Sequence, residues 1–405
     1  MKTLGRYRKM RKALFLFFRI IIAAFGALAA VSGCLSNGRS NDRRNTAAPA
    51  EGCPVAGDET ITRILTPIRQ KYVIPAIAAA IVTGNGVEHV GAVGVRKWGT
   101  DIPITLEDKW HLGSDTKTMT ATLVGILVER GLLKWETTVS EVFPEFAAGF
   151  HPDLRQVTIL QLLSHRAGIP ANLNYNDLLQ KRTTTQQRIE AVKRGFTQKP
   201  ANPPGSTFLY SNLGYIIIGA IVERITGLTW EQAMLAEVFA PLKMDSAGFG
   251  GLGTPGQIDQ PWGHVKSKQP FKENGPNADN PPFLGPAGRV HCTIQDWARF
   301  IVDQLRGARG EPALLKTETY RTLQTPPFGG DYALGWAVTE RDWGGGTVLN
   351  HNGSNLLFIA KVWVAPKRDF AILVCANEGL DASEAMDEVV TQLIQLQSTN
   401  RTESP

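Results

Sequence analysis

The amino-acid sequence predicts an α+β protein in which helices flank an antiparallel sheet and a helical region is inserted between its strands. Three observations lead to this expectation. Strand-like segments lie at residues 76–96 and 335–377. Helical periodicity dominates residues 116–250 between them. The chain has 405 residues with 43% hydrophobic content, which is enough to bury a sizeable core.

Taken in order, the elements begin with a helix near residues 58–72. The strand candidates "AIAAAIVTG" and "VEHVGAVGVR" meet at a Gly-Asn-Gly turn signal and predict an antiparallel hairpin. The helical stretch from Thr116 is interrupted at "FPEF", "RAGIP" and "NPPGS". Strands return between Gly335 and Asn377, and residues 382–397 have the spacing of a final amphipathic helix.

Residues 250–289 are rich in Gly, Pro and Asn and are far longer than an ordinary connection, which predicts a functional or disordered loop. The expected organisation is therefore one domain over residues 56–398. Its sheet part covers about 56–112 and 290–398, and its helical part covers about 113–289. Residues 399–405 are expected to form a loose tail.

The formal net charge of +6 comes from the N-terminus. Residues 1–33 hold seven basic residues and no acidic one, so the remainder has a formal charge of −1. This remainder offers no basic field for nucleic acid, and no patch of interleaved aromatic and basic residues is present. The sequence thus predicts no nucleic-acid partner.

The same N-terminus is typical of an export signal, because the basic start is followed by the apolar "IIIAAFGALAAVSGC". Its end, "VSGC", resembles a bacterial lipobox, in which Cys34 is lipidated after cleavage. Residues 1–33 are then a lipoprotein-type signal and 34–55 a flexible tether. The alternative is an uncleaved anchor, although Arg19 leaves a run shorter than the roughly 20 residues of a spanning helix. Both interpretations place the domain at a membrane of the cell envelope, facing outward.

The cysteines left after Cys34 are Cys53, Cys292 and Cys375, which allow at most one internal disulfide. Cys375 lies in the apolar run "FAILVCAN", which is typical of a buried strand. No cluster of cysteine and histidine residues has zinc spacing, so neither a metal site nor a cofactor is predicted.

Ser114 and Lys117 lie three residues apart at the start of an apolar helix-like run. Residues at i and i+3 share one face of a helix, so the lysine amine can approach the serine hydroxyl. The unpaired N–H groups of a helix N-terminus also favour negative charge that develops on an attacking serine. The alternative is that Ser114 or Asp115 caps the helix and Lys117 is a solvated charge. Because Ser-x-x-Lys occurs about once by chance in such a chain, companion motifs are needed.

Two companions follow. Tyr210 and Asn212 lie just after a Pro-Pro-Gly turn and before an apolar helix. His351 and Gly353 open a strand candidate, where a glycine lets a ligand lie against the edge of a sheet. A second His-x-Gly at His111–Gly113 shows that this motif is weak alone, so the order of the three motifs carries the evidence.

Ser-x-x-Lys, then Tyr-x-Asn, then His-x-Gly resembles the β-lactamase-related serine hydrolases, a group similar to class C β-lactamases and penicillin-binding proteins. The resemblance extends through "LQLLSHRAGIP", "VFAPLKMDSAGF" and "GPAGRVHCTIQDWARF", over about residues 60–395. It implies a β-lactamase/transpeptidase-like fold with the active site between the sheet and the helical region.

The resemblance also implies roles for single residues. Ser114 is the expected nucleophile, and Lys117 and Tyr210 share the transfer of its proton. Asn212 is expected to bind a substrate carbonyl or amide, and the backbone N–H groups of Ser114 and Ser354 to form the oxyanion hole.

His351 departs from the pattern of β-lactamases, which usually have lysine at this position. An unperturbed histidine is mostly uncharged at neutral pH, so uncharged esters are expected to be better substrates than penicillins. Arg289 is the nearest candidate for a compensating charge. Carboxylic esters, D-amino-acid peptides of the cell wall and β-lactams all remain open as substrates. The alternative is a non-catalytic binding or regulatory lipoprotein with this fold.

Other residues have simpler expected roles. His165 is expected to be a structural hydrogen-bonding residue rather than a base. Tyr175 and His264 are expected to be solvated loop residues, with contact to substrate near the cleft as the alternative. The tryptophans are expected in the core, namely Trp135, Trp230 and Trp336.

Overall fold

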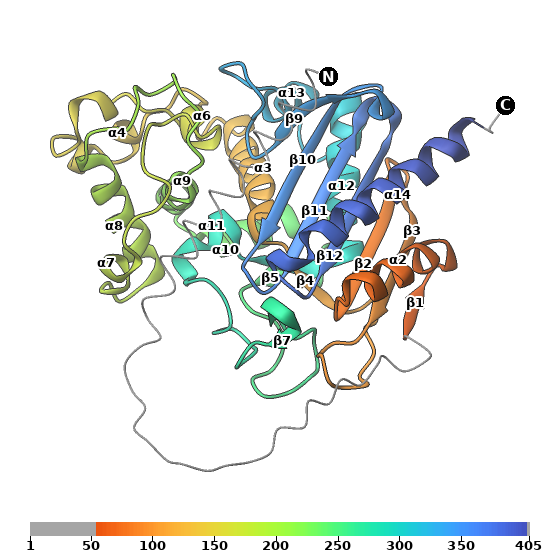
Figure 1. Ribbon diagram of the computed structural model, residues 1–405. Helices are drawn as coiled ribbons and strands as arrows, with labels where there is room; N and C mark the ends of the chain where they lie inside the picture. Colours follow the sequence, from red (N-terminus) through yellow and green to blue (C-terminus); the bar gives the residue numbers. More distant parts are fainter. Residues whose placement is uncertain (1–53, 403–405) are drawn as a thin grey trace, which may run out of the picture. The chain divides into compact units, whose positions relative to one another are not determined.

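The computed structural model describes residues 54–402 of the chain (Figure 1). The predicted signal, Cys34 and Cys53 lie outside the described residues. Within them, the predicted α+β fold with an antiparallel sheet is confirmed.

Seven strands form the main sheet in the order β1-β3-β2-β12-β11-β10-β9, and all neighbours are antiparallel. The strands are β1 (Val55–Gly57), β2 (Ala76–Thr83), β3 (Gly86–Gly94), β9 (Ala337–Arg341), β10 (Gly346–Ser354), β11 (Ile359–Ala365) and β12 (Phe370–Ala376). β2 and β3 make the predicted hairpin, in which Thr83 pairs with Gly86.

Helices cover both faces of this sheet, which explains the unbroken apolar runs of its central strands. β12 is buried along its whole length, and so is β2 except for its last residue. α2 (Glu59–Tyr72) and α14 (Ser383–Thr402) pack on one face, and α12 (Ile294–Arg309) packs on the other (Figure 1). α14 reaches Thr402, so the expectation that residue 399 begins a loose tail is wrong for these residues.

The inserted region contains the predicted series of helices. They are α3 (Thr116–Glu129), α4 (Val139–Val142), α5 (Pro144–Ala147), α6 (Ile159–Leu163), α7 (Tyr175–Leu179), α8 (Thr184–Thr197), α9 (Asn212–Thr226) and α10 (Trp230–Met234). Four of them start with a reciprocal capping box between a threonine and the third helical residue, at Thr138, Thr158, Thr183 and Thr229. Local sequence therefore sets where these helices begin.

The segment at residues 250–289 folds into short elements that link the two regions. It holds β6 (His264–Val265), β7 (Gln269–Pro270) and α11 (Gly285–Gly288). A second sheet follows, in which β8 (Val290–Thr293) pairs with β4 (Lys109–His111) and β5 (Gly248–Phe249). α13 (Thr317–Gln324) lies between α12 and β9 in the chain.

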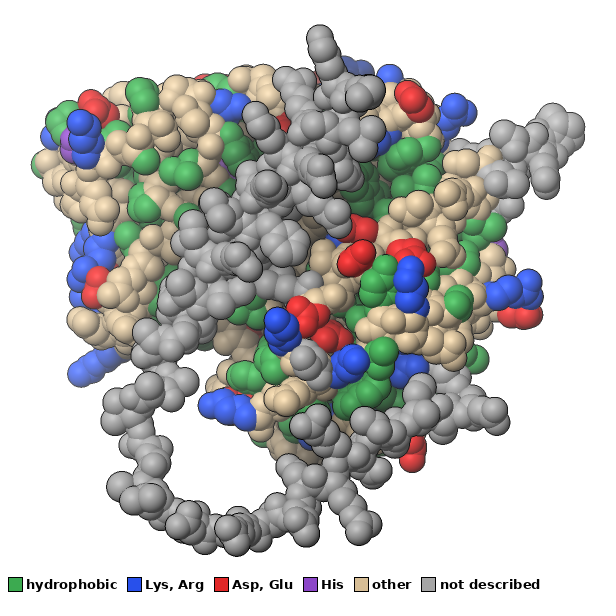
Figure 2. All heavy atoms as spheres, viewed as in Figure 1, with side chains coloured by type: hydrophobic (Ala, Val, Ile, Leu, Met, Phe, Trp, Pro, Cys, Tyr) green, Lys and Arg blue, Asp and Glu red, His purple; other side chains and the backbone are tan. Residues whose placement is uncertain are grey.

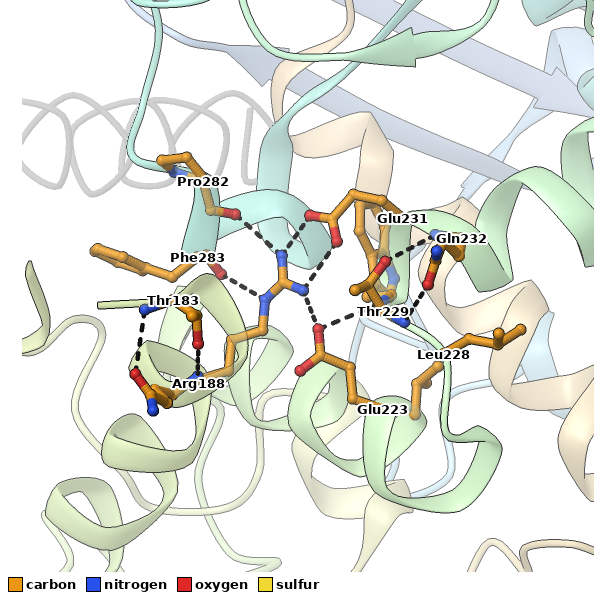
Figure 3. Close-up of polar contacts among 12 residues, drawn as sticks. Thr183, Arg188, Glu223, Leu228, Thr229, Glu231, Gln232, Pro282 and Phe283 are labelled. Atoms are coloured by element: carbon orange, nitrogen blue, oxygen red, sulfur yellow. Dashed lines mark hydrogen bonds and ion pairs between the residues drawn. The ribbon is translucent and has the colours of Figure 1, made fainter. Parts of the chain in front are cut away.

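Arg188 holds this segment against the helices (Figure 3). Its guanidinium, wholly buried, pairs with Glu223 and with Glu231, the latter at 2.6 Å. It also donates to the backbone carbonyls of Pro282 (3.0 Å) and Phe283 (3.3 Å). A buried cation with several charge-assisted partners fixes the chain just before α11.

His264 and Tyr175, both expected to be solvated loop residues, are less exposed than that expectation implies. His264 is wholly buried; its Nε2 accepts the Trp98 N–H, and its Nδ1 lies 2.7 Å from the Asn377 carbonyl. Burial lowers the pKa of His264 to about 4. Tyr175 is half-buried at the start of α7, with its ring against Phe283. Of the expected core tryptophans, Trp230 and Trp336 are buried and Trp135 is partly buried.

The described surface is mixed in charge. On the face shown in Figure 2, basic and acidic side chains are interspersed. Among residues 54–402, no single helix is long and apolar enough to cross a membrane; α9 and residues 230–239 meet this criterion only as a pair bent by 78°.

Candidate active site

Ser114 lies in a tight turn between β4 and α3. β4 ends at His111, and Gly113–Asp115 form one 3-10 turn before α3 starts at Thr116. Gly113 has φ = 51°, a left-handed conformation that favours glycine. The turn therefore presents Ser114 next to the N-terminus of α3, as its sequence position predicts.

Lys117 reaches Ser114 from the first turn of α3. Its Nζ lies 3.0 Å from Ser114 Oγ and also donates to the Ala287 carbonyl of α11. The side chain is wholly buried, so the idea of a solvated surface charge is wrong. Burial lowers the pKa of Lys117 well below its usual value, and the carboxyl of Asp115 opposes this shift only in part.

Tyr210 approaches Ser114 from the segment before α9. Its phenol is hydrogen-bonded to Ser114, and burial raises the phenol pKa despite this bond. The Lys117 Nζ lies 4.9 Å from the centre of the Tyr210 ring. Ser114, Lys117 and Tyr210 are thus in mutual contact, although 96 residues separate the serine from the tyrosine.

His165 supports the tyrosine segment, as expected of a structural residue. Its Nδ1 accepts the Ser211 N–H at 3.1 Å, and its ring centre lies 4.3 Å from that of Tyr210. Ser211 in turn caps α9 through the Gly214 N–H. Burial lowers the pKa of His165 well below its usual value, which keeps this imidazole neutral.

Asn212 is the first residue of α9, and its amide is held in one orientation. Its Nδ2 donates to Asn172 Oδ1 (3.1 Å), which also accepts the Tyr175 hydroxyl at 2.7 Å. Asn172 was not anticipated from the sequence, because a lone loop asparagine gives no periodic or motif signal.

The backbone of β10 lies directly against the nucleophile turn. A Cβ on Gly353 would meet the Leu112 carbonyl oxygen at 1.8 Å, and one on Gly113 would meet the Ser354 nitrogen at 2.2 Å. Neither glycine is replaceable without moving the backbone. Ser354 Oγ donates to the Phe358 carbonyl and accepts the Leu356 N–H, so this hydroxyl is committed to the turn after β10. The Ser354 and Ser114 backbones are consequently neighbours, as an oxyanion hole requires.

His351 is enclosed by Asp115 and Tyr332, and the sequence did not indicate either contact. Its Nδ1 lies 3.3 Å from Asp115 Oδ1, and its Nε2 lies 3.2 Å from the Tyr332 hydroxyl. The His351 side chain is 6% exposed, and that of Asp115 is wholly buried. Both ring nitrogens therefore face protein groups.

Asp115 had been considered as a helix cap, but its side chain makes no capping hydrogen bond. Burial raises the pKa of Asp115, while His351 and Lys117 act in the opposite direction. The position of Asp115 directly after Ser114 indicates that it lies near the site. Its contact with His351, 236 residues later, cannot be predicted from the sequence.

Arg289, the candidate compensating cation, is bound to another carboxylate. Its Nε lies 3.0 Å from Asp279 Oδ2, and the Asp279 side chain is wholly buried. Burial alone would raise the pKa of Asp279, but the hydrogen bond from His111 and the charge of Arg289 outweigh it and lower this pKa. Over residues 54–402, no group of three or more His, Cys, Asp or Glu side chains is placed to hold a metal ion. Cys292 and Cys375 are buried free thiols.

Comparisons with known proteins bear on the family and the fold. A family model described as Beta-lactamase matches residues 61–395. Penicillin-binding protein 4 of Amycolatopsis lactamdurans is 28% identical over 78% of this chain and 84% of its own length. Protein flp of Staphylococcus aureus (strain MW2) is 23% identical over 79% of this chain. This chain spans 63% of that relative's length, which is less than two thirds. A beta-lactamase of Escherichia coli (strain K12) is 26% identical over 62% of this chain and 61% of its own length.

Two solved structures share the fold. A crystal structure of SurE has a TM-score of 0.68 and 21% identity, covering 84% of this chain and 75% of that one. An octameric penicillin-binding protein homologue from Pyrococcus abyssi has a TM-score of 0.63 and 20% identity, covering 83% and 76%.

Proposed function

The chain belongs to the Beta-lactamase family, and on this premise we propose that it is a serine hydrolase that forms an acyl-enzyme on Ser114 and releases it to water. The observation that carries the proposal is the 3.0 Å contact between Ser114 Oγ and the buried Lys117 Nζ. Burial lowers the pKa of this amine, which favours the neutral form that can accept the serine proton.

The raised pKa of Tyr210 favours the protonated phenol, which can donate a proton to the leaving group. In acylation, Ser114 Oγ attacks the substrate carbonyl carbon while its proton moves to Lys117. The oxyanion is stabilised by the backbone N–H groups of Ser114 and Ser354. As the bond to the leaving group breaks, the proton returns from Lys117 through the Tyr210 phenol to that group. A water molecule then attacks the acyl carbon and gives its proton through Tyr210 to Lys117. The bond from the acyl carbon to Ser114 Oγ breaks, and Lys117 returns the proton to that oxygen.

We propose uncharged esters as the preferred substrates, ahead of cell-wall D-peptides and β-lactams. Support comes from His351, whose two ring nitrogens face Asp115 and Tyr332 and so offer no free N–H to a substrate carboxylate. Phe208 adds an apolar surface, because it is 39% exposed while its ring packs on Tyr332. Asn212 remains the proposed ligand of a substrate carbonyl.

The competing possibility is a binding or regulatory protein without turnover. The test is the intact mass of wild type and Ser114→Ala after treatment with a fluorophosphonate and, separately, a penicillin. A mass increase in wild type with fluorophosphonate, absent in the variant, is expected. Wild type that reacts with neither reagent would contradict the proposed nucleophile, and stable penicillin adducts would favour a penicillin-binding role.

We also propose that the protein is exported and lipid-anchored through Cys34, with its domain in the periplasm or outside the cell. This rests on the "VSGC" sequence and the polar tether after it. Its proposed partners are thus the membrane and a small-molecule or peptidoglycan-type substrate.

A further inference from the structure

The first His-x-Gly of the chain, at His111–Gly113, has a place in the structure that the proposed reaction does not yet use. His111 is wholly buried at the end of β4. Its Nδ1 accepts the Gly113 N–H at 3.1 Å, and its Nε2 lies 3.0 Å from Asp279 Oδ2. An Nδ1 that accepts a hydrogen bond carries no proton, so His111 is the neutral Nε2–H tautomer that donates to Asp279.

The same carboxylate holds the other side of the oxyanion hole. Asp279 Oδ1 accepts Asn355 Nδ2 at 3.0 Å, directly after Ser354. Asn355 Oδ1 accepts the N–H groups of Leu357 (3.1 Å) and Phe358 (3.0 Å), which shapes the turn between β10 and β11. One buried side chain therefore reaches both backbones that carry the oxyanion donors.

We propose that Asp279 is a positioning residue that sets the oxyanion hole, acting through His111 on the Ser114 turn and through Asn355 on the Ser354 turn. This inference rests on the proposed acyl-enzyme mechanism. The backbones it aligns are already so close that a Cβ on Gly113 would overlap the Ser354 nitrogen, so small rotations of either turn change the distance between the two donors. Arg289 Nε, at 3.0 Å from Oδ2, completes the set of donors around the carboxylate.

The substitution Asp279→Asn tests this point because an amide cannot replace the carboxylate. Oδ2 receives hydrogen bonds from His111 and Arg289, and Oδ1 receives one from Asn355. If the amide oxygen faces His111, its NH₂ opposes the Asn355 NH₂ and forces that side chain to turn. If the oxygen faces Asn355, the NH₂ opposes His111, which must take the Nδ1–H tautomer and lose the Gly113 bond. In either orientation, one of the two turns that carry the oxyanion donors loses a hydrogen bond that holds it.

The expected result is a ten- to hundredfold lower kcat on p-nitrophenyl acetate with KM within threefold, because a displaced oxyanion donor acts on the transition state. Asp303→Asn is the matched control. It also removes a buried carboxylate with several donors, among them the Tyr320 hydroxyl and the Leu314 N–H. We expect this control to lose stability but to keep kcat per folded molecule within threefold.

A second readout does not depend on turnover. In protein labelled with ¹⁵N, the His111 ring shifts report its tautomer, and the amide shifts of Gly113, Leu357 and Phe358 report the two turns. The shifts of the His111 ring and the Gly113 amide form one set, and those of the Leu357 and Phe358 amides form the other. Asp279→Asn should move one of these two sets, whereas Asp303→Asn should move neither. If Asp279→Asn does not fold, His111→Gln serves instead, since it removes the acceptor of the Gly113 N–H and should also lower kcat at least tenfold.

Unchanged ring and amide shifts in Asp279→Asn, or a kcat within threefold of wild type, would overturn the inference. An equal loss of kcat in Asp303→Asn would do the same. A wild type without hydrolase activity would instead refute the proposed function, and the shifts alone would then decide whether Asp279 links the two turns.

Discussion

Replacing Lys117 by methionine separates the chemical role of this lysine from any structural one. Methionine has a similar length and no charge, so it fills the buried space beside Ser114 without an amine. General-base catalysis contributes about 10²- to 10⁴-fold in rate, and a loss in this range is expected for kcat on p-nitrophenyl acetate. A residue that only held the fold would reduce activity through stability instead.

Although kcat falls, the free energy of unfolding of Lys117→Met should be higher than that of wild type, and the difference should depend on pH. The usual pKa of 10.5 applies to the unfolded chain, and burial places the folded value well below it. Between these two pKa values the unfolded state binds one proton more than the folded state, so wild-type stability rises with pH and falls as pH is lowered. The slope is about 1.36 kcal/mol per pH unit. Because Lys117→Met has no such group, its advantage over wild type should grow by this amount for each unit below about pH 10.

Urea unfolding of both proteins at pH 8, 9 and 10 measures this difference, since other titrating groups cancel between them. Lys361→Met is the matched control. That lysine is also buried, but its Nζ pairs with Asp387 and the Ser383 carbonyl, so its loss should reduce stability and spare kcat. A pH-independent difference between wild type and Lys117→Met would mean that Lys117 is charged in the folded protein, which would refute its role as a neutral base.

The remaining predictions concern the reaction unit, the anchor and the substrate. Ser114→Ala should abolish ester hydrolysis in a folded protein, and the double variant of Lys117 and Tyr210 should be scarcely slower than either single one, because residues that act as a unit are non-additive; losses that multiply would argue against a shared role. Cys34→Ala should move the protein from membranes to the soluble fraction, and a variant that still pellets after a high-salt wash would point to an uncleaved anchor. Wild type should have a higher kcat/KM for neutral esters than for penicillins from pH 5.5 to 8.5, and His351→Lys should improve penicillin acylation by about ten- to a hundredfold, the worth of one charge-assisted hydrogen bond. Efficient penicillin turnover by wild type at pH 8.5 would contradict this preference.

Much of the fold was predictable because it depends on local signals. The β2–β3 hairpin follows from two apolar strand-like segments around Gly-Asn-Gly, and α9 follows from its apolar run after the Pro-Pro-Gly turn. The contact between Ser114 and Lys117 follows from their spacing of three residues on one helix face. In each case a few adjacent residues contain the information.

Long-range partners were not predictable in this way. Asp279 lies 165 residues after Ser114, in a segment whose glycines and prolines indicated only a loop. Tyr332 opens the family-like stretch "YALGWAV", which does not mark it as a partner of His351, and Asp115 was a candidate cap although its carboxylate faces His351. His264 was expected to be exposed to solvent because its partners are distant in the sequence. It contacts Trp98 and Asn377, which lie 166 and 113 residues away. Tertiary packing alone decides these pairings.

Two polar groups of the segment at 250–289 contact the residues around Ser114. The Ala287 carbonyl of α11 accepts a hydrogen bond from the buried Lys117 amine, the proposed base. Asp279 contacts His111 at the end of β4 and Asn355 in the β10–β11 turn, the two backbones that it is proposed to align. Both groups come from this one segment, whose end is fixed by Arg188 through Pro282 and Phe283. The segment therefore acts as the third wall of the site, beside the helix that carries Lys117 and the strand that carries His351.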